Sequence, residues 1–208
     1  GAQRVEAVEI CKVDDAMRPI MGTEERVECD ALILSVGLIP ENELACALDV
    51  PLDAHTKGPI VDQNAMTLCN NIFVCGNALH VNDLVDYVSE SGEAAGAAAA
   101  KAAFAQGSAE AQSAKRTLAE VQCDGAFLTL VPQRVDIQTL TKETIFYFRA
   151  REEREKTCLT VLANGKIIAK KTYRQLRPPE MERVALDLTQ CGLSAESKLE
   201  WRLTAAES

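Results

Sequence analysis

The second half of the chain alternates apolar and polar residues in short runs, a pattern typical of strands with one buried face. In residues 183–188 and 198–203, Val, Leu and Trp alternate with Ala, Asp, Glu and Arg. Asn164-Gly165 separates two such runs and favours a two-residue hairpin, because both residues tolerate positive φ. Their number and spacing predict a small immunoglobulin-like β-sandwich of six strands, at residues 126–131, 144–149, 157–162, 166–173, 183–188 and 198–203.

The first half has nearly unbroken apolar runs, bounded by Gly, Pro and Asn. Residues 30–36 and 71–75 are apolar over most of their length, as in strands covered on both faces of a parallel sheet. Alternation over residues 4–13 and a short run at 26–29 predict two further strands, and residues 41–47 predict a short helix. The fold class expected for this half is therefore α/β.

A long helix is expected to begin between Asp83 and Asp86 and to end near Ala105. Nine of the thirteen residues from Glu93 to Ala105 are Ala, which favours a helix and allows close approach to a neighbouring backbone. The small polar residues that follow predict a linker. We therefore expect an α/β domain over 1–105, a linker over 106–116 and an all-β domain over 117–208.

The distribution of charge agrees with this division. Residues 1–105 carry 6 basic and 17 acidic side chains, and the remainder carries 16 and 14. The net charge of −9 disfavours nucleic acid and anionic membranes as partners. No apolar run approaches the ~18 residues of a membrane span, and no secretory signal is visible, so a cytoplasmic protein is expected. The mixed-sign run from Arg149 to Lys156 predicts a solvated loop.

Eight cysteines form no C-x-x-C pair, and only His55 and His80 could join them as metal ligands. A zinc site is therefore not expected. Several cysteines lie within apolar runs, which favours buried or idle reduced thiols. A thiol-based redox protein remains a third interpretation, and it would require one thiol with a strongly lowered pKa.

The best candidate ligand site is Gly76-Asn77, between the apolar run 71–75 and the long helix. In α/β proteins a strand, a glycine turn and a helix amino terminus form a common binding site, because exposed helical N–H groups favour negative charge. Gly-Asn is also an ordinary turn. The residue types alone leave both interpretations open.

Four motifs in order resemble the FAD-dependent pyridine nucleotide-disulfide oxidoreductases, and among them the NAD(FAD)-dependent dehydrogenases. The motifs are Val36-Gly-Leu-Ile-Pro-Glu-Asn-Glu-Leu44, Gly58-Pro-Ile-Val-Asp62, Met66-Thr67 and Ile72-Phe-Val-Cys-Gly-Asn77. The resemblance spans residues 3–105 and continues through His80 into the small-residue helix. It implies an FAD/NAD(P)-binding fold with a partial FAD site, and NAD(P) as the second cofactor of the complete enzyme.

The resemblance also implies roles for individual residues. Gly76 would lie beside the ribityl–pyrophosphate part of FAD, and Asn77, where many members have Asp, would bond the ribityl chain. The start of the helix would direct N–H groups at the flavin N1/O2 edge; its residues are Leu84, Val85, Val88 and Ser89. His80 would lie near flavin or substrate, or serve a structural role. No catalytic residue is identified.

Two departures from the family pattern limit what this chain can do. It contains no G-x-G-x-x-G turn and no redox-active cysteine pair. We therefore expect this chain to be a piece of a longer enzyme that passes hydride between NAD(P)H and an unidentified acceptor. Its partner would be the N-terminal portion of the same protein, and without that portion the chain is expected to be inactive. Without that portion, Leu32, Ile33, Leu34 and Val36 would be exposed, so self-association is expected.

A different class of function is the alternative. The β-sandwich would then be a non-enzymatic module that captures a partner subunit, and residues 1–105 would be a degraded scaffold.

Overall fold

The computed structural model describes residues 4–14, 16–35, 37–105 and 116–206. Contacts divide the chain into two compact units, Gly1–Gly37 and Leu38–Ser208. The domain division expected at 106–116 stays a prediction, because residues 106–115 lie outside the described residues.

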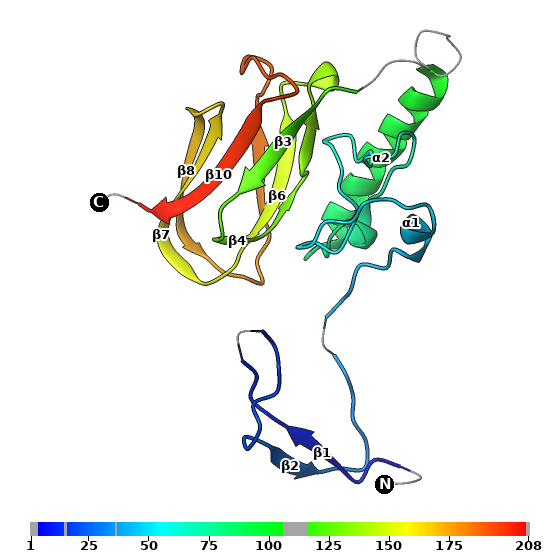
Figure 1. Ribbon diagram of the computed structural model, residues 1–208, viewed down its shortest axis with the longest axis vertical. Helices are drawn as coiled ribbons and strands as arrows, with labels where there is room; N and C mark the ends of the chain where they lie inside the picture. Colours follow the sequence, from blue (N-terminus) through cyan, green and yellow to red (C-terminus); the bar gives the residue numbers. More distant parts are fainter. Residues whose placement is uncertain (1–3, 15, 36, 106–115, 207–208) are drawn as a thin grey trace. The chain divides into compact units, whose positions relative to one another are not determined.

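The first unit contains one antiparallel pair of strands, β1 (Ala7–Ile10) and β2 (Glu25–Glu28) (Figure 1). Both strands were expected from the sequence. The strand predicted at 30–36 is wrong over residues 30–35, which have no secondary structure, and Ile33 is 91% exposed. A central strand requires neighbouring strands to hydrogen-bond with, and the described part of this unit gives residues 30–35 none.

The second unit begins with α1 (Glu43–Ala47), close to the predicted short helix, and contains the 3₁₀ turn η1 (Gly76–Ala78). The strand predicted at 71–75 is also wrong: only Phe73 forms a bridge, to Met66. Its apolar side chains lack the sheet neighbours that a parallel strand needs.

The predicted long helix is confirmed as α2 (Val85–Ala105). The close backbone packing expected of its small residues is not observed at two glycines on this helix. A Cβ atom built on Gly92 or Gly96 would meet no heavy atom within 4 Å.

Two β-sheets follow, which we call the two-sheet region (residues 118–205). One sheet has the order β5-β3-β10-β7-β8, and the other has the order β4-β6-β9 (Figure 1). All neighbours are antiparallel except β3 and β10. The strands are β3 (Leu118–Cys123), β4 (Phe127–Val131), β5 (Arg134–Asp136), β6 (Thr144–Ala150), β7 (Arg154–Ala163), β8 (Lys166–Leu176), β9 (Glu182–Leu186) and β10 (Lys198–Ala205); the 3₁₀ turn η2 (Ile137–Thr139) follows β5.

All six predicted strands are present in this region, and β3 and β5 were not predicted. The hairpin at Asn164-Gly165 is confirmed: both residues have positive φ, 50° and 78°, and Ala163 lies opposite Lys166. The immunoglobulin-like topology stays a prediction.

The core of this region lies between its two sheets. Trp201 of β10 is fully buried, with its ring 4.8 Å from that of Phe146 and 6.3 Å from that of Phe148, both on β6. Every second residue of β6 is buried, from Thr144 to Ala150. The period-two alternation in the sequence therefore corresponds to the inward face of each sheet.

The edge strand β5 is covered by residues 61–63 of the preceding segment. The Arg134 backbone N–H donates to the Val61 carbonyl (3.1 Å), and the Gln133 side chain accepts from the Val61 N–H (3.2 Å). The Gln63 side chain bonds both the N–H and the carbonyl of Asp136, each at 2.8 Å. These bonds satisfy backbone groups that an edge strand would otherwise expose.

No helix among the described residues is long and apolar enough to cross a membrane.

We predict that the exposed run at residues 32–34 drives self-association. Exposed apolar segments associate with apolar surfaces of other chains, so the sedimentation coefficient should rise with protein concentration. Ile33→Lys should reduce this association, and Ile10→Lys, at another exposed apolar position in the same unit, is the control. Concentration-independent sedimentation of the unsubstituted chain would contradict the prediction.

We predict that Leu199→Ala lowers the free energy of unfolding by about 2–5 kcal/mol, because Leu199 is fully buried between the sheets. Leu128→Ala is the matched control, since Leu128 is 37% exposed, and its effect should be much smaller. Denaturant unfolding measures both. Equal losses would mean that the core does not lie where the structure places it.

Candidate functional site

The turn at Gly76 packs directly against α2. Gly76 has a φ of +61°, and a Cβ atom there would lie 3.3 Å from Cγ1 of Val88. Its backbone N–H donates to Oγ of Ser91 at 2.9 Å. Glycine is favoured here both by the left-handed conformation and by the close approach to the helix.

The side chain of Asn77 closes its own loop. Its Oδ1 accepts hydrogen bonds from the backbone N–H of Asn82 (3.0 Å) and from the Asn82 side-chain amide (3.3 Å). That amide also donates to the His80 carbonyl at 2.9 Å. The acceptor of Asn77 is therefore occupied within the loop that leads to α2.

The first turn of α2 presents apolar side chains to solvent. Leu84 is 53% exposed and Val85 is 79% exposed. Ser89 is exposed too, whereas Val88 is half-buried against Gly76. The structure thus brings Gly76 and Val88 together and leaves Leu84, Val85 and Ser89 accessible.

Arg149 of β6 holds the loop before α2 on the two-sheet region. Its guanidinium donates to the Val81 carbonyl (3.1 Å), and it pairs with the Asp83 carboxylate. Asp83 accepts in turn from the backbone N–H of Met181 at 2.7 Å. Arg149 is the charged residue of β6, and its side chain is 12% exposed. The solvated loop predicted from Arg149 to Lys156 is therefore wrong at both ends. Arg149 belongs to β6 and residues 154–156 belong to β7, so only residues 151–153 form an exposed loop.

A second ion pair anchors the loop at Asp62, which is the last residue of one of the four motifs. Arg116 donates to the Asp62 carboxylate (2.9 Å) and to the Thr67 carbonyl (2.6 Å). The Asp62 side chain is 1% exposed, and burial raises its pKa against the opposing effects of backbone N–H bonds and of Arg116. Sequence reasoning found Asp62 only as part of a motif and did not find Arg116.

His80 is buried beside the ring of Tyr147 and near the charged side chains of Arg149 and Asp83. It is 6% exposed, and its ring centroid lies 5.7 Å from that of Tyr147. Burial, together with the nearby positive charge of Arg149, lowers the pKa of His80 from 6.5 to about 4, and Asp83 opposes this shift. His80 is therefore a neutral imidazole near pH 7.

Tyr147 and Arg183 both bond the carboxylate of Glu90 on α2. The Tyr147 hydroxyl donates to Oε2 and the Arg183 guanidinium donates to Oε1, each at 2.9 Å. Burial and this bond to Glu90 raise the pKa of Tyr147 to about 12. The three side chains connect α2 to β6 and β9.

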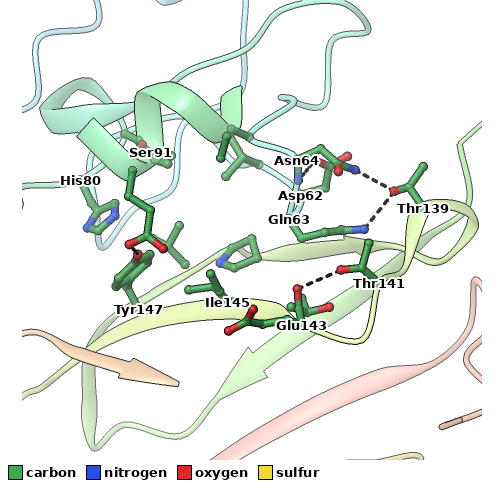
Figure 2. A pocket seen from close by; sticks show the side chains of 18 residues that line it. Asp62, Gln63, Asn64, His80, Ser91, Thr139, Thr141, Glu143, Ile145 and Tyr147 are labelled. Atoms are coloured by element: carbon green, nitrogen blue, oxygen red, sulfur yellow. Dashed lines mark hydrogen bonds between the residues drawn. The ribbon is translucent and has the colours of Figure 1, made fainter. Parts of the chain in front are cut away.

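A cavity of about 250 Å³ lies between α2 and the two-sheet region. Figure 2 shows Ser91 on the helix side and Ile145 and Glu143 on the strand side. His80 and Tyr147 lie at one end, and Asn64 lies at the other, where its amide donates to Oγ1 of Thr139 at 2.7 Å (Figure 2). None of the six predicted cofactor residues lines this cavity. Among its polar residues, sequence reasoning singled out His80 and, as the last residue of a motif, Asp62.

All eight cysteines have free thiols, and none is buried. Burial, one of the two alternatives expected for these thiols, is therefore wrong, and idle reduced thiols stay a prediction. Cys46, Cys75 and Cys123 are exposed because the runs that contain them lie at the surface or at strand ends. Within the described ranges, no group of three or more His, Cys, Asp or Glu side chains could hold a metal ion.

A protein-family model described as pyridine nucleotide-disulphide oxidoreductase matches residues 3–119, more than half of the chain. No curated protein and no solved structure matches it.

We predict that protonation of His80 destabilises the protein in acid. The pKa of His80 falls on folding, so its contribution to stability is present above pH 6.5 and is lost as the pH drops toward about 4. The loss is about 3 kcal/mol. In denaturant unfolding between pH 7 and 4, the free energy of unfolding should fall less steeply with decreasing pH for His80→Gln than for the unsubstituted chain.

His55→Gln is the control for removal of an imidazole, because His55 is exposed whereas His80 is buried. Carboxylates contribute to the pH dependence of stability in the unsubstituted chain and in both variants. The difference in pH dependence between the unsubstituted chain and His80→Gln therefore reports the contribution of His80. Parallel stability curves for His80→Gln and the unsubstituted chain would contradict the prediction.

Proposed function

This chain belongs to the pyridine nucleotide-disulphide oxidoreductase family, and from that membership we propose that it forms part of a flavin enzyme. The enzyme passes hydride between NAD(P)H and an acceptor, and this chain contributes one part of its FAD site. The observation that carries the proposal is the exposed first turn of α2, at the end of the short loop that follows the glycine turn packed on this helix.

The start of α2 fits the edge of an isoalloxazine ring. Backbone N–H groups of a first helical turn carry partial positive charge, and Leu84 and Val85 provide accessible apolar surface beside them. The chemistry that FAD supplies when bound is hydride acceptance at N5, with negative charge gathering at the N1/O2 edge. The helix terminus would stabilise that charge.

Gly76 and Asn77 fit the cofactor less directly. The N–H of Gly76 is bonded to Ser91, and the side-chain oxygen of Asn77 is bonded to Asn82. We infer that these two residues position the start of α2, and that Val85 and its neighbours in the first turn contact the flavin.

The remaining parts of the site must come from outside these 208 residues. No G-x-G-x-x-G turn occurs in them, and such turns hold the pyrophosphates of FAD and NAD(P). We propose that the N-terminal portion of the same protein supplies both turns, and that this chain alone is not catalytic.

We predict that Val85→Asp lowers the reduction potential of bound FAD by about 10–30 mV, because a carboxylate at the helix start opposes negative charge on the reduced flavin. The measurement is a spectroelectrochemical titration of the polypeptide that carries these residues together with the Gly-rich turns.

Ala97→Asp is the matched control: Ala97 is exposed on the same helix, twelve residues further on, and the potential should not change. An unchanged potential in Val85→Asp with flavin still bound would refute the role of α2. Protein without flavin absorbance would refute the proposed function itself.

A further inference from the structure

The cavity between α2 and β6 is lined by a buried polar side chain that no described residue bonds. His80 is 6% exposed and lines the cavity, and neither ring nitrogen forms a hydrogen bond with another described residue. Its imidazole is therefore available to a polar group of a ligand.

The net negative charge of the residues that line the cavity favours a positively charged ligand. Three carboxylates line it, those of Asp62, Glu90 and Glu143, and no Lys or Arg does. Arg116 neutralises Asp62 at 2.9 Å. Arg183 is shared by Glu90 at 2.9 Å and Glu143 at 4.0 Å. One negative charge is therefore left without a counterion, because the nearby pair of Arg149 and Asp83 is balanced and His80 is neutral.

The shape and the remaining lining select a small apolar body. A cavity of about 250 Å³ has the volume that about eight water molecules occupy in the liquid. Its apolar walls come from both sides, including Leu79 from the loop before α2 and Pro132 and Ile145 from the two-sheet region. The ring of Tyr147 closes one end (Figure 2).

We propose that this cavity binds a small primary amine with a compact aromatic or aliphatic body, in its ammonium form. The ammonium group lies against the carboxylates of Glu143 and Glu90, and the body packs on Ile145 and Pro132. The unprotonated ring nitrogen of His80 accepts a hydrogen bond from the ligand's ammonium group. This site shares no residue with the proposed flavin contact, and the inference does not depend on it.

Benzylamine is the probe, and benzamide and benzoate are its neutral and anionic counterparts. Binding to the full chain is followed by NMR of the ¹⁵N-labelled imidazoles, of which the chain has two. Benzylamine should shift the His80 signals saturably, and the exposed His55 provides the comparison within the same spectrum. Benzamide should bind more weakly, and benzoate should not bind.

Two variants locate the site. Ala94→Leu fills the cavity from the α2 side and should abolish the shift, whereas Ala97→Leu, on the same helix but outside the cavity, should preserve it. Glu143→Gln removes the uncompensated charge and should weaken benzylamine about threefold. Thermal unfolding of each variant shows whether it is folded, and Glu143→Gln keeps the test intact if Ala94→Leu is not.

The proposal is overturned by any of three results: no saturable shift of His80 at millimolar benzylamine, equal binding of benzoate or benzamide, or unchanged binding in folded Ala94→Leu.

Discussion

Hydrogen bonds between residues 61–63 and the edge strand β5 are the constraint on which the second unit depends. The segment from residue 49 to residue 82 forms turns and isolated bridges but no sheet of its own. Its backbone N–H and C=O groups must therefore form hydrogen bonds within turns or with a neighbouring part of the chain. The two-sheet region is that neighbour, through the Val61 and Gln63 bonds to residues 133–136. Both the glycine turn and the cavity wall are positioned by this docking.

Paired charges give the docking its specificity. Each ion pair joins residues far apart in sequence: Arg116 with Asp62, Arg149 with Asp83, and Arg183 with Glu90. Burying such a pair contributes little net stability, because desolvation offsets the attraction. A misplaced loop would, however, leave the Asp62 carboxylate buried without a partner, and that would be costly. The pairs therefore select one arrangement of the loop and α2 on β6 and β9.

The helix α2 serves two surfaces at once. Its first turn is accessible and leads from the loop that Gly76 closes, as the proposed flavin contact requires. One to two turns later, Glu90 and Ser91 face the cavity above β6. A ligand in the cavity would contact α2, the same helix whose first turn forms the proposed flavin contact. The two proposals can fail separately, because they use different residues.

The sequence by itself determined the elements whose signal is local. Alternation marked six strands of the two-sheet region, Asn164-Gly165 marked a hairpin, and the Ala-rich run marked α2. The ordered motifs identified the family. Each of these signals lies within a few consecutive residues, or in a fixed order along the chain.

Only the tertiary structure decided the rest. The apolar run at 71–75 became a half-buried segment with one bridge, because a parallel strand exists only where neighbouring strands pair with it. β5 was missed because three residues are too few to show a period. Arg149 and Glu90 became partners of residues 66 and 93 positions away. Hydrogen bonds and charges that act across such separations leave no periodic trace in the sequence, since they depend on which surfaces meet once the chain has folded.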